Sequence, residues 1–421
     1  MRILLMNDRI PPENRGGTGI VVWRIAQALQ ARGHEVHVIT ATDKASFEET
    51  RDGIPTYHLH VQYRERFSAW FSLYNPQVNA PLKALYERIQ PDVVHAHNIH
   101  HDLTYYSLAL AHQQGIPAIF SSHDVMPFAY HKMSHFIDPM RCGVQSPKDY
   151  KMPPFYNLKQ MRFRYNPFRN LTIRTLLRHY TQIRTAPSQE LCDAHHANGL
   201  PEFTCVHNGI DVQDFAVAED VVSALRDRLG LADKKVILFA GRLTGAKGTA
   251  QLLAALAQVV ENVPEAVLLV LSSVPIAEQI KGSPYAYLQD KHIVSAGWLA
   301  GDELAAAFRL AHIVTAPSII FDTFPTVNLE AMASESVPIA TCYGGSHEAI
   351  VHDETGYIIN PFDTDAFAEK IVYVLTHDNV RHWMVARGYQ RVIEKFSIAG
   401  QIDRYLALYD QAQMTMKAGT S

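Results

Sequence analysis

The chain has 421 residues, of which 47% are hydrophobic and 19% are charged. This is ordinary globular composition, and it excludes a disordered chain, a collagen-like chain and a coiled coil. The 42 acidic residues outnumber the 38 lysines and arginines, which gives a net charge of −4. Such a balance argues against a protein that neutralises a nucleic-acid backbone. At roughly 150 residues per domain, the length predicts two or three domains.

The sequence pattern favours a cytoplasmic protein. The apolar run after Met1 is too short for a signal peptide. The longest apolar stretch, Ala266–Leu271, is far shorter than the ~20 residues that span a bilayer. The four cysteines form no C-x-x-C pair, which favours a reducing compartment over a disulfide scaffold or a structural zinc site. Peripheral contact with the inner face of the membrane stays open as an alternative.

Strand and helix patterns alternate from the start of the chain. A buried strand is predicted over Arg2–Asn7, then a glycine-rich loop, a helix that ends at Gly33, and a strand over Glu35–Thr40. This βαβ pattern favours a parallel sheet with helices on its faces. Further strands are predicted at Val93–His97 and Ala118–Ser121.

The same pattern begins again near residue 235. Five more strands are predicted, at Lys235–Ala240, Ala266–Leu271, Ile293–Ala296, His312–Thr315 and Pro338–Cys342. The repetition predicts an α/β protein of two doubly wound domains, whose ligands bind beyond the carboxyl ends of the strands, in a cleft between the facing domains. We expect the first domain over 1–206 together with a C-terminal helix at about 396–421, and the second over 207–395. The stretch Asn379–Lys417 is helical in pattern and contains no proline.

Two loops carry residues suited to phosphate. Gly16-Gly17-Thr18-Gly19 precedes a helix, so its N–H groups either form an anion site or make a tight turn without a ligand. The third glycine of a dinucleotide fingerprint is missing, which disfavours an NAD-binding protein. The loop Gly241–Gly248 contains Arg242 and Lys247, and it is either a diphosphate site or a solvated basic loop.

A third loop, Asp322–Glu330, places two acids eight positions apart at the start of a predicted helix. A glutamate there is able to accept two hydrogen bonds from a vicinal diol such as ribose. The alternative is an ordinary helix N-terminus, where acidic side chains are favoured by the helix dipole.

In this order and at these spacings, the three loops resemble those of the family 4 retaining glycosyltransferases of GT-B fold. Five shorter pieces support the resemblance, which covers nearly the whole chain and is clearest over 205–360: Gly33-His34-Glu35-Val36, Pro91–His97, Asn208-Gly209-Ile210-Asp211, Gly297-Trp298-Leu299 and Gly344-Gly345-Ser346-His347-Glu348. The resemblance implies two Rossmann-like domains that face each other across a cleft.

The resemblance also implies a role for each matching residue. The diphosphate of a nucleotide-sugar is expected on Arg242, Lys247, Gly17 and Thr18. Glu330 is expected on the ribose, and the backbone of Leu299 near the base. The transferred sugar is expected to contact Asp322, Thr323, Phe324 and Thr326, with His123 beside it, and the acceptor to contact His97 and Asn98. Two residues depart from the family pattern and put the identity of the sugar in doubt: Asp322 replaces a glutamate, and Pro325 lacks the N–H of the usual glycine.

These roles predict a metal-independent hexosyltransferase without a cofactor, in which His123, Arg242, Lys247 and Asp322 are catalytic. Negative charge that grows on the leaving diphosphate is stabilised by the two basic side chains. By analogy with the family, the sugar is transferred with retention from a nucleoside diphosphate sugar, most often a UDP-sugar. The acceptor is an unidentified glycan, lipid-linked or small molecule, as in polysaccharide biosynthesis.

Other interpretations remain. A GT-B protein that binds nucleotide-sugar without transferring it, or an epimerase of the same fold, would share these loops. His95, His97, His100 and His101 cluster after one strand, and a metal site there is a less favoured alternative.

The segment 148–178 combines eight lysines and arginines with interleaved aromatic residues and a single acid, Asp149. It is either a patch that contacts the acceptor or an anionic membrane surface, or a solvated loop. The earlier cluster of Phe67, Trp70, Phe71 and Tyr74 is interpreted as a local core.

Overall fold

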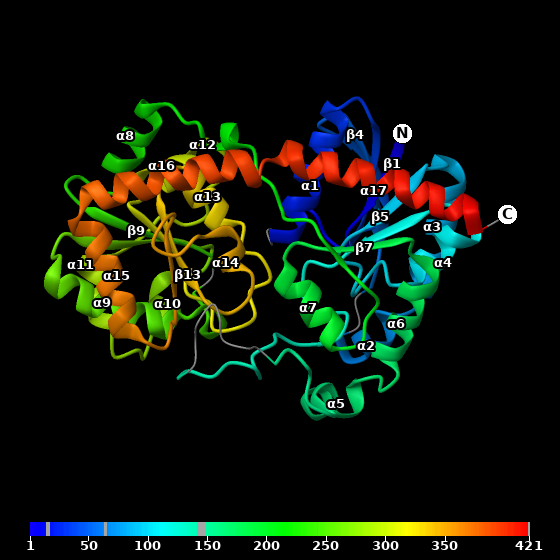
Figure 1. Ribbon diagram of the computed structural model, residues 1–421, viewed down its shortest axis with the longest axis horizontal. Coiled ribbons are helices and arrows are strands. Elements are labelled where there is room, and N and C mark those ends of the chain that lie inside the picture. Colours follow the sequence, from blue (N-terminus) through cyan, green and yellow to red (C-terminus); the bar gives the residue numbers. More distant parts are fainter. Residues whose placement is uncertain (14–16, 63–64, 141–148, 242, 420–421) are drawn as a thin grey trace. The chain divides into compact units, whose positions relative to one another are not determined.

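The computed structural model describes residues 1–421 except 14–16, 63–64, 141–148, 242 and 420–421. The chain divides into two compact units (Figure 1). Unit 1 comprises Met1–Met133, Asp149–Asn208 and Ile398–Ser421, and unit 2 comprises Ser134–Lys148 and Gly209–Ser397.

Unit 1 is built on an eight-stranded sheet with the order β3-β4-β2-β1-β5-β6-β7-β8. Only β3 and β4 pair antiparallel, as a hairpin at one edge. The strands are β1 (Arg2–Met6), β2 (Glu35–Thr42), β3 (Phe47–Arg51), β4 (Ile54–His60), β5 (Val93–Ala96), β6 (Ala118–Ser121), β7 (Ile183–Ala186) and β8 (Thr204–Cys205). The predicted strands of the first half are confirmed, whereas the hairpin, β7 and β8 were not predicted.

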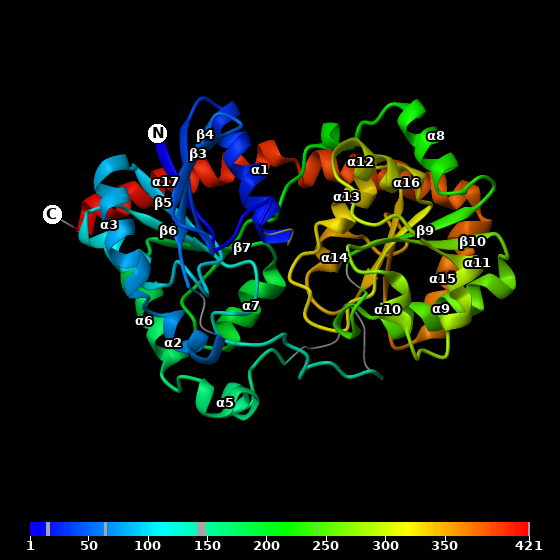
Figure 2. The ribbon, with the colours of Figure 1, turned by 180° about the vertical axis from the view of Figure 1, so that it is seen from behind.

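Helices cover both faces of this sheet (Figures 1 and 2). The helices of unit 1 are α1 (Gly17–Ala31), α2 (Ser68–Phe71), α3 (Pro76–Ile89), α4 (Tyr106–Gln113), α5 (Tyr156–Met161), α6 (Arg169–Tyr180), α7 (Gln189–Ala197) and α17 (Ile398–Gly419), with short 3₁₀ turns η1 (Glu65–Phe67) and η2 (Arg162–Arg164). The last helix packs beside α1, and its Tyr405 and Tyr409 are buried one turn apart against the sheet.

Unit 2 is built on a six-stranded, fully parallel sheet with the order β11-β10-β9-β12-β13-β14. The strands are β9 (Lys235–Ala240), β10 (Ala266–Leu271), β11 (Ile293–Ser295), β12 (Ile313–Ala316), β13 (Val337–Thr341) and β14 (Tyr357–Ile359). Neighbouring residues point to opposite faces, so Ile237 is buried in one hydrophobic cluster and Leu238 in another. A strand buried on both faces explains the continuous apolar runs in the sequence.

The helices of unit 2 are α8 (Glu219–Arg228), α9 (Thr249–Asn262), α10 (Ile276–Ile280), α11 (Gln289–His292), α12 (Gly301–Leu310), α13 (Val327–Ala333), α14 (Ser346–Ala349), α15 (Thr364–Thr376) and α16 (Asp378–Lys395), with 3₁₀ turns η3 (Val212–Phe215), η4 (Gly245–Lys247) and η5 (Ala286–Leu288). The helical pattern over 379–417 is two helices, since α16 ends at Lys395 and α17 begins at Ile398. They belong to different units.

One segment departs from the expected division of the chain. The residues from Ser134 belong to unit 2, although the predicted first domain runs unbroken to 206. The Phe136 ring lies 5.8 Å from that of Phe321 and 6.2 Å from that of Tyr343, and Asn360 Nδ2 donates to Pro139 O over 2.7 Å. Burial of Phe136 in this aromatic cluster holds the segment on unit 2.

Two further observations concern the helices and the cysteines. Among the described residues, the helices include none long and apolar enough to cross a bilayer. Cys342 is disulfide-bonded, a pairing that the sequence analysis did not predict. Pairing depends on the path of the chain, which cysteine spacing in the sequence does not reveal.

Candidate functional site

Three loops of unit 2 meet at the carboxyl ends of its parallel strands. They follow β9, β12 and β13 and span 241–248, 317–326 and 342–345. Backbone hydrogen bonds join them, because Ile319 N donates to Ala246 O over 3.1 Å and Asp322 N donates to Tyr343 O over 3.1 Å. Residues from three distant parts of the sequence are therefore held at one edge of the sheet.

Lys247 and Asp322 form an ion pair at this edge, with 2.9 Å between Nζ and Oδ2. The same carboxylate oxygen accepts a hydrogen bond from the Ser318 hydroxyl over 2.7 Å. The Lys247 side chain keeps 42% of its surface exposed, against 13% for Asp322. The ammonium is therefore positioned by its partners and still accessible to an anion.

Two glycines allow the loops to approach so closely. Gly248 has φ +76°, and a Cβ there would lie 2.0 Å from Pro317 O. Gly344 has φ +106°, and its Cβ would lie 2.0 Å from Asp322 O. No other residue fits either position, so these glycines fix Lys247 and Asp322 in place.

The other residues predicted in unit 2 differ in exposure. Thr323, Thr326 and Glu330 are partly exposed, with Glu330 in the first turn of α13. The Phe324 side chain is instead packed in the core, 4% exposed, with its ring 5.9 Å from that of Phe396. Any contact of Phe324 with a sugar would therefore be made by its backbone. The Leu299 side chain is also buried. Arg242 lies outside the described residues.

A second polar set lies in unit 1, beyond the carboxyl ends of β5 and β6 and at the start of α1. His97 Nδ1 and His123 Nε2 are 2.9 Å apart. Asn98 Nδ2 donates to Thr18 Oγ1 over 3.3 Å, and Asn98 Oδ1 accepts the His123 N–H over 3.2 Å. The fold thus brings together four residues that the sequence predicts as functional: Thr18, His97, Asn98 and His123. Gly17, the first residue of α1, is exposed.

These histidines are buried in their neutral form. Burial lowers the pKa of His123 to about 4 and lowers the pKa of His97 far below its usual range. The His95 ring centroid lies 4.0 Å from that of His97, and burial also lowers the pKa of His95. The two ring nitrogens of His95 hydrogen-bond to Tyr409 and Ser121. His97 Nε2 is buried and has no hydrogen-bond partner among the described residues, so this atom is available to a ligand.

Asp124 is the site residue that the sequence reasoning missed. Its carboxylate accepts hydrogen bonds from Asn98 Nδ2 over 2.9 Å and from Met126 N over 2.8 Å, and it lies 3.1 Å from His100 Nε2. Burial alone would raise its pKa, but the charge and hydrogen bond of His100 and the Met126 N–H lower the pKa to about 2. Its position directly after His123 was the signal available in the sequence.

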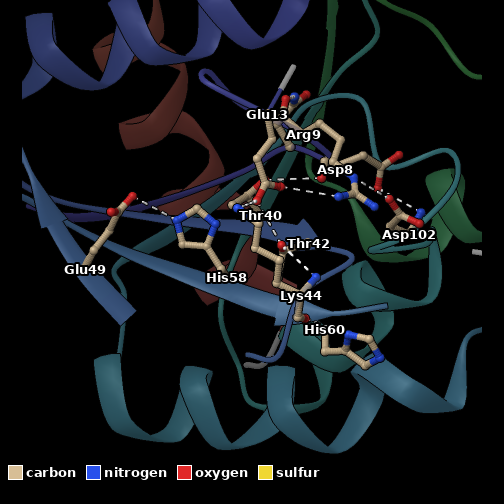
Figure 3. A network of polar contacts seen from close by, with 11 residues as sticks. Asp8, Arg9, Glu13, Thr40, Thr42, Lys44, Glu49, His58, His60 and Asp102 are labelled. Atoms are coloured by element: carbon tan, nitrogen blue, oxygen red, sulfur yellow. Dashed lines mark hydrogen bonds and ion pairs between the residues drawn. The ribbon is translucent and has the colours of Figure 1, made fainter. Parts of the chain in front are cut away.

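A polar network supports the loop that precedes α1 (Figure 3). Arg9 is held between Asp102, with 3.0 Å from Nε to Oδ2, and Glu13, with 3.4 Å from NH1 to Oε2. Glu13 also accepts the Thr42 hydroxyl over 2.9 Å. Asp8 accepts three backbone N–H groups, from residues 101, 102 and 103. This network holds Asp8, Arg9 and Glu13 against Thr42 and the chain at 101–103. Gly16 itself lies outside the described residues.

Two family models match the chain in succession. Residues 15–214 match "Glycosyltransferase Family 4" and residues 222–391 match "Glycosyl transferases group 1". The chain belongs to the group 1, family 4 glycosyltransferases. This confirms the resemblance inferred from the three loops.

Similar proteins extend over almost the full length of this glycosyltransferase. An uncharacterised glycosyltransferase of Methanocaldococcus jannaschii is 26% identical over 94% of the chain and 95% of its own length. A sucrose-phosphate synthase structure from Thermosynechococcus elongatus has a TM-score of 0.75 at 21% identity, covering 97% and 98% of the two chains. The Anabaena HepE protein in complex with UDP has a TM-score of 0.69 at 17% identity, covering 97% and 100%. The protein is a two-domain GT-B glycosyltransferase.

Proposed function

We propose that the protein transfers a sugar, with retention, from a UDP-sugar to an acceptor hydroxyl and needs no metal ion. The observation that carries the proposal is the Lys247–Asp322 pair at the carboxyl edge of the unit 2 sheet. The exposed ammonium of Lys247 suits the diphosphate of such a donor, and the adjacent carboxylate of Asp322 suits the hydroxyls of its sugar. Structures of HepE in complex with UDP and with UDP-glucose support a nucleotide-sugar of this class.

Each predicted residue has a place in the proposed reaction. Lys247, with Arg242, binds the diphosphate and stabilises the charge that grows on it as the sugar–oxygen bond breaks. Glu330 accepts the ribose hydroxyls, and Leu299 places its backbone near the base. Asp322, Thr323 and Thr326 contact the transferred sugar. In this proposal Phe324 contributes only its backbone, because its side chain is in the core.

The residues of unit 1 supply neutral hydrogen-bonding groups. We assign His123 to the transferred sugar, Gly17 and Thr18 to the diphosphate, and His97 and Asn98 to the acceptor. A histidine with its pKa lowered to about 4 stays uncharged at neutral pH, so His123 offers a hydrogen bond without opposing a cationic sugar in the transition state. The acceptor oxygen attacks on the face that the diphosphate leaves, and the diphosphate accepts its proton.

Thermal unfolding with nucleotides tests the donor. UDP, GDP, ADP and NAD are added separately to the wild type, to Glu330→Ala and to a control, Glu265→Ala, an exposed glutamate before β10. At one hundred times its dissociation constant, a ligand stabilises a protein by about 2.7 kcal/mol. We expect UDP to stabilise the wild type and the control but not Glu330→Ala. A shift with another nucleotide corrects the base, and no shift with any nucleotide rejects the proposal.

The same protein with UDP-glucose separates transfer from its two alternatives. Slow release of glucose by water in place of the acceptor supports transfer. A donor that binds and stays intact supports a binding protein, and conversion to an epimeric nucleotide-sugar supports an epimerase.

We also propose that the acceptor is presented at an anionic membrane surface, which unit 1 contacts through α2, α5, η2 and the start of α6. Large apolar side chains are exposed there: Phe67 48%, Trp70 48%, Phe155 72%, Phe163 75%, Phe168 66% and Leu171 52%. The two parts of the patch adjoin, because the Arg66 guanidinium lies 5.6 Å from the Phe67 ring and 5.9 Å from the Phe163 ring. The interpretation of Phe67, Trp70, Phe71 and Tyr74 as a local core is wrong for three of the four residues, because Phe67 and Trp70 are each 48% exposed and Tyr74 is 53% exposed.

Basic side chains flank these aromatic groups. Lys151, Lys159, Arg162, Arg164 and Arg178 are exposed, whereas Arg169 is fully buried and binds Ser72 and Met126 instead. Each exposed cation near an anionic surface contributes about 1 kcal/mol. This charge, next to exposed aromatic rings, favours a lipid surface over solvent.

Sedimentation with vesicles tests this contact. We expect binding to vesicles that contain phosphatidylglycerol, weaker binding to phosphatidylcholine alone, and at least a ten-fold loss in Phe163→Ala. The control is Tyr287→Ala, an aromatic residue of unit 2 that is 66% exposed. Equal binding by both variants rejects the membrane contact and leaves the donor proposal untouched.

A further inference from the structure

A cavity of about 660 Å³ lies in unit 2, at the opposite end of the sheet from Lys247 and Asp322. Its wall comprises the turn before β14, the second half of α15 and the first turns of α16. Asp378, at the start of α16, pairs over 3.9 Å with Lys235, the first residue of β9. The cavity is therefore at the amino ends of the strands, whereas the donor loops follow the carboxyl ends. Figure 1 shows α15 and α16 along the outer side of unit 2.

Two exposed aromatic rings line this cavity, and each packs against a neighbouring side chain. Trp383 of α16 is 47% exposed, and the Arg387 guanidinium lies 5.0 Å from its ring centroid. Arg387 is itself paired with Glu354 over 2.5 Å. Tyr373 of α15 is 38% exposed, and the ring of His377 lies 4.3 Å from it. The rings are thus held as preformed platforms, so little freedom is lost when a ligand packs on them.

The charged groups of the cavity argue against a phosphorylated ligand. Asp353 and Glu369 face a single lysine, Lys370, so the charged lining has a net charge of −1. The Lys370 ammonium lies 5.1 Å from the Tyr357 ring, which also lines the cavity. An anion would be repelled by the two carboxylates. The hydroxyls of an uncharged polyol would find hydrogen-bond acceptors in Asp353 and Glu369, and both a donor and an acceptor in the Asn379 amide.

We propose that this cavity binds a neutral oligosaccharide, separately from the donor. A pyranose ring has C–H groups on its faces and hydroxyls around its rim. The C–H groups pack against the negative faces of Trp383 and Tyr373, and the hydroxyls donate to Asp353 and Glu369. The volume is within the range of small-ligand sites, about 300–1,000 Å³. The site adds a glycan-binding function that the transfer reaction does not require.

Fluorine NMR of the full chain labelled with 5-fluorotryptophan tests the site. The chain has four tryptophans, and Trp383→Phe assigns the resonance of Trp383. The probes are maltotriose, cellotriose and mannotriose. We expect at least one to shift the Trp383 resonance saturably, with a dissociation constant raised at least ten-fold in Tyr373→Ala and Glu369→Gln. In Trp70→Ala, a control with 48% exposure in unit 1, the constant is unchanged.

Three results would overturn the inference. No trisaccharide shifts the Trp383 resonance, or the dissociation constant is the same in Tyr373→Ala and Glu369→Gln as in the wild type. The third is that a trisaccharide shifts only the Trp298 resonance. Thermal shifts with UDP keep this test separate from that of the proposed function. Tyr373→Ala retains its UDP response if both proposals hold. If a trisaccharide binds and UDP does not stabilise the protein, only the donor proposal is refuted. If UDP stabilises the protein and no trisaccharide binds, only the glycan site is refuted.

Discussion

The polar edges of the two units are built in opposite ways. In unit 1 the histidines at the carboxyl ends of the strands are buried and hydrogen-bonded to each other, and burial lowers their pKa values. In unit 2 the corresponding edge carries a charged pair, Lys247 and Asp322, on loops joined by backbone hydrogen bonds. Position at the end of a parallel strand is common to both, but the environment decides whether a group is neutral or charged at pH 7. The paired histidines of unit 1 therefore offer neutral hydrogen-bonding groups, whereas unit 2 offers a charged pair.

Acid should affect unit 1 most. Burial lowers the pKa of seven of its histidines below their usual value: His34, His95, His97, His101, His123, His131 and His195. Because the unfolded chain binds these protons first, stability falls as pH drops from about 6.5 towards 4, by on the order of 1 kcal/mol per pH unit for each net proton. Burial raises the pKa values of Asp8 and Asp102, Asp102 to about 6, and these two groups partly oppose the loss.

Hydrogen exchange read by mass spectrometry at pH 7 and pH 5 measures this contrast. Protection in unit 1 should fall by several kcal/mol. Unit 2, where burial lowers the pKa of His312 to about 4, should lose less. An equal loss in both units would remove the contrast.

Lys247→Ala tests the charged edge directly. Removing one preorganised cation from a developing negative charge costs about 10²–10³ in rate, so we expect hydrolysis of UDP-glucose to fall by that factor. Lys281→Ala, an exposed lysine after α10, is the control. Equal rates in the two variants would show that Lys247 is a solvated side chain.

Gly344→Ala tests whether backbone approach fixes Asp322. A Cβ at φ +106° would lie 2.0 Å from Asp322 O, so the loops after β12 and β13 must separate. We expect a loss of about 2–4 kcal/mol in the free energy of unfolding by urea. Gly245→Ala, where a Cβ meets nothing within 4 Å, should change stability far less. If Gly344→Ala is as stable as the wild type, the loops after β12 and β13 separate without cost and do not fix Asp322.

Asp124→Asn should have the smallest effect. It removes the anion beside His100 and one acceptor in a buried network, at a cost of about 1–2 kcal/mol. Thermal unfolding measures the loss, with Asp193→Asn, an exposed aspartate of α7, as the comparison. If both substitutions are neutral, Asp124 does not organise the histidines of unit 1.

Short-range pattern in the sequence was sufficient for the central strands and for the loops that follow them. Runs such as Ala266–Leu271 are apolar throughout because both faces of a parallel strand are buried. The β3–β4 hairpin escaped prediction because its outer strand is exposed and polar, as its sequence Phe47–Arg51 shows. The C-terminal helix expected at about 396–421 corresponds to α17, which begins at Ile398 after α16 ends at Lys395.

What the sequence determined by itself is the family, the α/β class and the identity of the residues that end up at the strand termini, since these depend on local pattern and order along the chain. Only the tertiary structure decided which of them meet. Lys247 pairs with Asp322, which is 75 residues away in the sequence. Asp124 binds Asn98 beside the hydrogen-bonded pair His97 and His123. The Phe324 side chain is in the core, and Phe163 is exposed. Burial and pairing are set by contacts between distant segments, and those contacts determine charge, pKa and exposure.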